Sequence, residues 1–247
     1  MALADVPRIG AMTAFGYAPE IVARYPNVVG GVIFASGLAN GPTPDVLQAA
    51  YLEEQRQTLS RIGGTPLSEI PSLAAWRKVF RGFGVDPTQY RSAAEALLRR
   101  LTKSGDIPCI NALVDAGNLV SVRHALPVAV FDTRSLSGQL TVRFAAGDEL
   151  FTPLGEQETE HPEPGEAIFA DAAGLVFARR WCWRQSEQSA ARAEIGAAII
   201  TIEGHHHGAR DTVGQALEEL HDLLARHSGG SFQVGIVDAE NPALQPA

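Results

Sequence analysis

The hydrophobic positions of this 247-residue chain follow two different periods, which predicts both strands and helices. Short apolar runs bounded by turn residues predict strands at 28–34, 127–131, 139–144, 197–202 and 232–237, and a hairpin at 166–170 and 175–180. Helical spacing predicts helices at 45–61, 72–80, 111–124 and 212–227. The two kinds of element mix without a strict strand–helix rhythm. This order favours a mixed α/β fold, in which helices pack on a mixed sheet.

Local signals add one helix to this list and refine one strand. Ser92 and Glu95 form a capping box that predicts one more helix, which Gly105 should end. Gly30 and Gly31 lie inside an apolar strand and indicate a close approach of another group to the backbone.

A soft boundary near Tyr90 divides the chain. We expect residues 1–90 to pack on the same fold as residues 91–240, and residues 241–247 to form a disordered tail.

Composition narrows the class of protein. Hydrophobic residues make up 45% and charged residues 19% of the chain, as in a soluble globular protein. Cys109 and Cys182 are the only cysteines, which favours the reducing cytoplasm over a disulfide-rich secreted protein. No apolar run reaches the roughly 18 residues of a membrane span, and the first residues lack the pattern of a signal peptide.

The charge is unevenly distributed. The net charge is −8, which argues against a general binder of nucleic acid, DNA included. The window 76–103, however, holds seven basic and two acidic residues. Such a window forms either a local basic surface or a pair of solvated helix faces, and the sequence leaves both open.

Three polar residues share one face of the apolar helix at 111–124. Asn111, Asp115 and Asn118 have the spacing i, i+4 and i+7. Polar groups on a buried face need partners, so the stripe either lines a pocket or anchors neighbouring loops.

The segment 179–184 alternates arginine with tryptophan and cysteine. At strand period, Arg179 shares a face with Trp181 and Trp183, whereas Arg180 and Arg184 lie on the other face. Arginine beside tryptophan can stack on bases and bind phosphate, or can pack in a core.

Other patterns point away from familiar chemistry. The run 205–207 has three histidines, but adjacent imidazoles cannot all converge on one ion, so we expect an exposed loop and no metal. Phosphate-binding, dinucleotide-binding, serine-hydrolase and zinc-protease motifs are absent. We therefore expect no cofactor, and composition and spacing alone assign no catalytic class.

One stretch carries a family resemblance. Residues 110–120, INALVDAGNLV, followed by LPVAVFD at 126–132, resemble the B3/B4 domain of the phenylalanyl-tRNA synthetase β subunit. In that family a helix reading roughly IDAVVDVTNYV leads into QPMHAFD. The resemblance continues more loosely to Glu203, and so covers about residues 90–203.

The resemblance implies a mixed α/β fold and a pocket that hydrolyses tyrosine wrongly attached to phenylalanine tRNA. Glu203 aligns with the family's pocket glutamate, whereas Ala129 replaces a family histidine and Trp183 falls near a pocket glycine. These changes imply an altered amino-acid preference. The implied catalytic residues are Glu203 and Asn111, and Asp115 and Asn118 complete the implied pocket with Ala129 and Trp183.

The resemblance also implies the partner. Arg179, Arg180 and Arg184 would contact the aminoacyl end of a tRNA, in the cytoplasm, with no membrane and a possible homo-oligomer. Motifs of a synthetase core are absent, so the leading hypothesis is a deacylase acting in trans. A non-catalytic module that binds tRNA or a partner, or a binder of amino-acid-like molecules, remains as the alternative.

Overall fold

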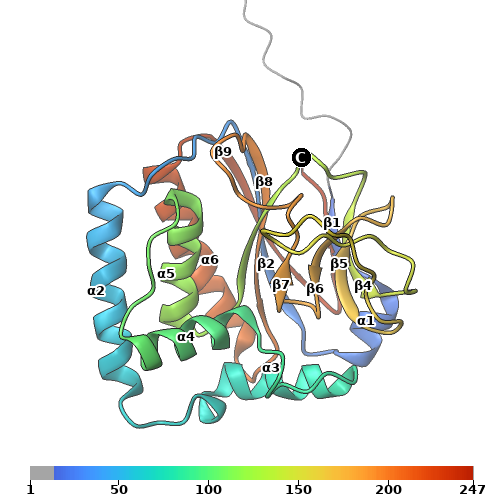
Figure 1. Cartoon of the computed structure of the whole chain (residues 1–247), viewed down its shortest axis with the longest axis horizontal. Coiled ribbons are helices and arrows are strands. Elements are labelled where there is room, and N and C mark those ends of the chain that lie inside the picture. The colour runs from blue at the N-terminus through green and yellow to red at the C-terminus, as the bar shows by residue number, and fades with distance from the viewer. Residues whose placement is uncertain (1–13, 247) are drawn as a thin grey trace, which may run out of the picture.

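A computed structural model describes residues 14–246 of the chain. Its elements lie in three layers: most of the helices on one side, a four-stranded sheet in the middle, and a six-stranded sheet on the other side (Figure 1). The predicted mixed α/β fold is confirmed, with its strands divided between two sheets.

The four-stranded sheet has the order β3-β8-β2-β9, and every neighbouring pair is antiparallel. Its strands are β2 (Val29–Ser36), β3 (Val128–Asp132), β8 (Ala197–Gly204) and β9 (Ser231–Asp238). β2 and β8 are nearly buried along their whole length, which explains their continuous apolar sequences.

The six-stranded sheet has the order β10-β1-β4-β5-β6-β7. Its strands are β1 (Phe15–Tyr17), β4 (Leu140–Phe144), β5 (Ala167–Ala170), β6 (Val176–Arg179), β7 (Arg184–Gln185) and β10 (Ala243–Leu244). β1 and β4 are parallel and the other neighbours are antiparallel. β5 and β6 form the hairpin that the sequence predicts.

The helices are α1 (Pro19–Arg24), α2 (Asp45–Ile62), α3 (Pro71–Gly82), α4 (Ala93–Ser104), α5 (Ala112–His124) and α6 (Ala209–His227), with a short 3₁₀ turn η1 (Leu67–Glu69). One hydrophobic core joins α2, α4, α5 and α6 to the four-stranded sheet. A second core, rich in aromatic side chains, joins the two sheets to α3.

The cap predicted for α4 is half present. The Ser92 hydroxyl accepts a hydrogen bond from the Glu95 amide at 3.3 Å, and Gly105 ends the helix in the left-handed region with φ 83°. The Glu95 side chain does not return to Ser92; it pairs with Arg77 of α3 instead.

The end of the chain differs from the prediction. Residues 241–247 are expected to form a disordered tail, but Ala243 and Leu244 form β10 against β1. The Leu244 side chain packs against the aromatic core, and this apolar contact explains the order of the segment. Ala247 lies outside the described residues.

The region before Tyr90 contributes to both sheets. β1 belongs to the six-stranded sheet, and β2 lies in the middle of the four-stranded one. No helix within residues 14–246 is long and apolar enough to cross a membrane.

Candidate functional site

Glu203 is a buried carboxylate near the end of β8, between the two sheets. Its side chain is 2% exposed. The Tyr17 hydroxyl donates to Glu203 Oε1 at 2.7 Å, and the Trp181 indole donates to the same oxygen at 3.0 Å. From the residues that the structure describes, Oε2 accepts no hydrogen bond. One oxygen is therefore fixed by the protein and the other is free to meet a ligand.

A glycine makes room for this arrangement. Gly30 of β2 lies directly opposite Glu203 in the sheet. A Cβ at Gly30 would stand 2.3 Å from the Tyr17 hydroxyl, which is far inside contact distance. The predicted close approach at the two glycines is confirmed, since a Cβ at Gly31 would meet Val213 and Leu217 at 3.1 Å.

Aromatic rings surround the carboxylate. The Trp76 and Trp181 rings meet edge to face at 5.4 Å between centroids, and the Trp76 indole donates to the Glu203 carbonyl at 3.3 Å. The centroid of the His205 ring lies 4.5 Å from that of Trp76 and 5.0 Å from that of Trp181. No cation pairs with the Glu203 side chain within residues 14–246, so its charge is held by neutral donors alone.

His205 does not lie in the exposed loop that the sequence predicts. Its side chain is 8% exposed, because the strand β8 carries it into the aromatic core. Burial, with a smaller effect from His206, lowers the pKa of His205 to about 3. The imidazole is therefore neutral at physiological pH. Within the described part of the chain, no three side chains of the metal-binding types gather into a site.

Burial gives Glu203 unusual acid–base properties. Desolvation raises the pKa of Glu203 to about 7, although the hydrogen bonds from Trp181 and Tyr17 lower it in part. The same burial, together with the Glu203 charge, raises the pKa of Tyr17 well above its ordinary value, so the phenol remains a donor. A carboxylate with a pKa near neutrality can take or give a proton at physiological pH.

A small cavity of about 70 Å³ opens beside Glu203. Its walls include Ala129 of β3, Thr201 of β8, Trp181 and Trp183. The lining is largely apolar, with Glu203 as its one acidic group. Ala129, Trp183 and Glu203, which the resemblance assigns to a pocket, therefore do line one cavity.

The segment 179–184 is not the continuous strand that its alternation suggests. β6 ends at Arg179, and a turn with positive φ values of 45° at Arg180 and 59° at Trp181 leads into β7. The turn directs the Trp181 indole towards Glu203. The predicted division of side chains between two strand faces is therefore wrong. Arginine and tryptophan are not residue types that mark a left-handed turn, so the sequence does not indicate this one.

The three arginines predicted to bind RNA have different surroundings. Arg179 is 4% exposed and donates to Glu166 at 2.9 and 2.7 Å and to Glu160 at 2.7 Å. Arg180 lies over the Tyr90 and Trp183 rings, at 3.8 and 4.5 Å from their centroids. Arg184 pairs with Glu156 at 2.7 Å. Arg179 therefore has a buried structural role. Arg184 lines the cavity, and Arg180 stacks on Trp183, which forms part of the cavity wall.

The polar stripe of α5 lies away from the cavity. Asn111 caps the helix, since its oxygen accepts from the Val114 amide at 3.0 Å and its nitrogen donates to the Ala191 carbonyl at 2.9 Å. Asp115 is fully buried and accepts from the Ile110 amide at 3.0 Å. These contacts match the alternative in which the polar stripe anchors neighbouring loops. None of Asn111, Asp115 and Asn118 lines the Glu203 cavity.

Two residues of the site escape sequence reasoning. Tyr17 lies 186 positions before Glu203, and its short strand carries no motif. Trp76 looks like an ordinary core residue in its local pattern. Trp181 is singled out in the segment 179–184, but for base stacking or core packing and not as a donor to Glu203. The signal that could have found them is the buried glutamate itself, because a buried carboxyl group needs donors.

The chain is similar to known proteins of one family. A family model described as the B3/4 domain matches residues 75–229, more than half of the chain. The phenylalanine–tRNA ligase beta subunit of Bradyrhizobium diazoefficiens is 40% identical over 81 residues, which are 33% of this chain and 10% of that protein. The same subunit of Neisseria meningitidis serogroup B is 38% identical over 78 residues, 32% of this chain and 10% of the relative. The matches thus span about a tenth of the length of these curated relatives.

A solved structure aligns with a larger part of the chain than these relatives do, at a lower sequence identity. An N-terminal fragment of the phenylalanyl-tRNA synthetase beta-subunit from Pyrococcus horikoshii has a TM-score of 0.45 and 13% identity, over 92% of this chain and 52% of that one. Glu203, Trp76, Trp181 and the cavity walls at Ala129 and Trp183 lie within the family match, whereas Tyr17 lies before it. The chain belongs to the B3/4 domain family.

Proposed function

We propose that the chain hydrolyses a mischarged aminoacyl-tRNA in trans, at the cavity beside Glu203. Its matched relatives are named as phenylalanine–tRNA ligase beta subunits, which directs attention to tRNA and its amino acid. The reaction would take place in the cytoplasm, and the free cysteines Cys109 and Cys182 need no oxidising compartment.

The observation that carries the proposal is a buried carboxylate with a pKa of about 7 and one free oxygen at a cavity. In its charged form Glu203 accepts a proton from a water molecule as the water oxygen attacks the ester carbonyl. The bond between the carbonyl carbon and the ribose oxygen then breaks, and the ribose oxygen takes up the proton. The products are the free amino acid and a tRNA with an intact 3′ end.

Other groups at the cavity are less suited to the chemistry. Desolvation and the neighbouring Glu203 raise the pKa of the Cys182 thiol, which keeps it protonated and a poor nucleophile. Ala129 can neither donate nor accept. The proposal therefore needs no covalent intermediate and rests on Glu203 and on the positioning of water.

The size of the cavity supports an amino acid other than tyrosine. A volume of about 70 Å³ with Trp183 on its wall suits a small side chain better than a phenol ring. We propose a preference for a small amino acid, which follows the altered preference that Ala129 and Trp183 indicate.

One observation favours a second candidate, a non-catalytic module that binds tRNA. Glu203 Oε1 already accepts two hydrogen bonds inside the fold, so the carboxylate has a structural role whether or not it reacts. In that case the chain would bind tRNA, or an amino-acid-like molecule, without cleaving an ester.

The test is deacylation of a panel of mischarged tRNAs by the purified chain, with Glu203→Gln as the inactive variant and Glu218→Gln, an exposed position on α6, as the control. We expect one ester to be cleaved above its spontaneous rate, and the rate above background to rise with pH through about 7, because only the charged form of Glu203 is a base. Full activity in Glu203→Gln would remove this residue from the mechanism. Binding of tRNA without cleavage of any ester would support the second candidate, the non-catalytic tRNA-binding module.

A further inference from the structure

A basic cleft lies on the helical side of the molecule. It is formed by α4, by α3 and by the connection between α2 and η1, and has a volume of about 400 Å³. Arg77, Arg99 and Thr102 line it from the helices, and Gly63 and Gly64 line it from the connection. The two glycines present backbone without side chains, which keeps the cleft open to a large ligand.

The cleft has an excess of positive charge. Glu95 is its single acidic side chain; it is 3% exposed and is shared by Arg77 and by Arg91, whose Nε lies 3.9 Å away. Arg99 follows Glu95 by one helical turn, and Lys103 follows Arg99 by another. Both are exposed, and neither forms an ion pair with any residue in the range 14–246.

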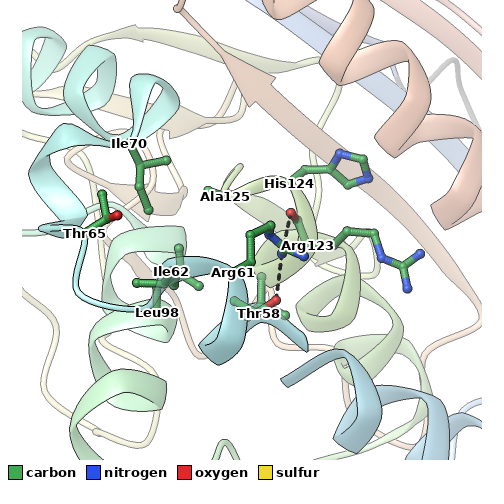
Figure 2. Close-up of a pocket in the computed structure, with 10 residues that line it drawn as sticks. Thr58, Arg61, Ile62, Thr65, Ile70, Leu98, Arg123, His124 and Ala125 are labelled. Carbon is green, nitrogen blue, oxygen red and sulfur yellow. Dashed lines mark hydrogen bonds between the residues drawn. The ribbon is translucent and has the colours of Figure 1, made fainter. Parts of the chain in front are cut away.

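A neighbouring pocket shows what a neutralised site looks like. This pocket, about 210 Å³ in volume, adjoins the cleft at Ile62 and Thr65 and is also lined by arginines (Figure 2). There Arg61 donates to the Thr58 hydroxyl and the Arg123 carbonyl, and Arg123 pairs with Glu54 and Glu219. Its arginines are used within the fold, whereas Arg99, which lines the cleft, and Lys103, which lies one turn further along α4, are not.

The same contrast holds for the arginines at the Glu203 cavity. Arg179 and Arg184 have carboxylate partners and Arg180 is stacked between rings. An anionic ligand would have to displace those partners, but it would meet Arg99 and Lys103 directly. α4 also connects the two places, because Ala93 at its first turn lines the Glu203 cavity.

We infer that this cleft, through Arg99 on its wall and Lys103 one turn further along α4, binds the sugar–phosphate backbone of an RNA. The inference rests on the proposed function in one respect, that the RNA is the tRNA whose 3′ end reaches the Glu203 cavity. Regularly spaced cations on one face of a helix suit a chain of phosphates, and the net charge of −8 repels RNA elsewhere on the molecule.

The test measures binding of fluorescently labelled tRNA by the full chain across a series of salt concentrations. The variant is the pair Arg99→Glu and Lys103→Glu, and the control is the pair Arg56→Glu and Arg226→Glu, which changes the net charge equally at other exposed helix positions. A milder pair, Arg99→Ala and Lys103→Ala, checks the result without adding negative charge. Unchanged melting temperatures establish that all of them fold.

We expect the glutamate pair to weaken binding at least tenfold and the alanine pair to lower the salt slope by about 1 to 2, one unit for each lost phosphate contact. The control pair should bind nearly as the wild type does. Equal weakening by both glutamate pairs, or a wild type that does not bind tRNA even in low salt, would overturn the inference. Deacylation by the Glu203→Gln variant is scored separately, so failure of the cleft and failure of the catalytic proposal are distinguishable.

Discussion

Two buried carboxylates lie on either side of one turn, and the turn serves them in opposite ways. Arg179 and the Arg180 amide bind Glu166, which is 3% exposed. The next residue, Trp181, donates instead to Glu203, which is 2% exposed. Glu166 is thus neutralised by a guanidinium, whereas Glu203 has only a phenol and an indole.

The difference separates a structural carboxylate from a reactive one. A bidentate guanidinium fixes the charge of Glu166 and occupies both of its oxygens. Neutral donors leave the charge of Glu203 uncompensated, so burial raises its pKa to about 7 and its second oxygen remains open. Burial alone does not create a reactive group; burial without a cation does.

The largest effect is expected at the paired carboxylate. Arg179→Ala removes the bidentate partner of buried Glu166 and leaves it only the Arg180 guanidinium at 4.0 Å, so the free energy of unfolding should fall by about 3–5 kcal/mol. Chemical denaturation measures the free energy of unfolding. The control is Arg184→Ala, which removes a half-exposed ion pair with Glu156 and should change this free energy by no more than about 1 kcal/mol. Equal effects of the two variants would mean that the buried pair is not structural.

The next effect concerns the pH dependence at Glu203. Its folded pKa of about 7 lies above the ordinary value of 4.5, so the folded state of the wild type loses stability as pH rises through this window. Glu203→Gln does not titrate. The stability of the variant relative to wild type should therefore rise by up to about 3 kcal/mol between about pH 5 and pH 8. Urea denaturation at several pH values measures the difference, and a difference that does not vary with pH would contradict the expected titration.

A smaller effect is expected at the donor Tyr17. Tyr17→Phe removes one of two hydrogen bonds to Glu203 Oε1, which should lower stability by about 2 kcal/mol above neutral pH, where the carboxylate is charged. It should also raise the pKa of Glu203, because that hydrogen bond lowers it. The midpoint of the stability curve, and of the rate profile if the chain is a deacylase, should move to higher pH. Tyr25→Phe, whose hydroxyl does not contact Glu203, should leave both midpoints unchanged.

The regular elements could be predicted because each has a local signal. The strand at 28–34, the helix at 45–61 and the hairpin around 171–174 agree with β2, α2 and the β5–β6 pair to within a few residues. The turn at Arg180 and Trp181 could not be predicted from the sequence. The alternation of arginine and tryptophan there is typical of a strand, and the left-handed backbone depends on tertiary contacts. The short strand β10 likewise depends on a distant partner, β1.

The site was only partly within reach of the sequence. Resemblance to a known family singled out Glu203, Ala129 and Trp183, which line one cavity. It also pointed to Asn111, whose hydrogen bonds are used to cap α5. The pKa of Glu203 depends on burial and on Tyr17, which lies far away in the sequence, so no local pattern could indicate it.

The central position of β2 has a consequence for how the chain reaches its folded state. β2 pairs over its full length with β8 and β9, so Val29 lies opposite both Gly204 and Asp238. The sheet cannot close until nearly the whole chain is available, and such distant pairings slow folding. The region matched by the family, residues 75–229, lacks both β2 and β9. Expressed alone it would expose the long edge of β8 that β2 covers in the full chain, and unpaired strand edges of this kind lead to aggregation.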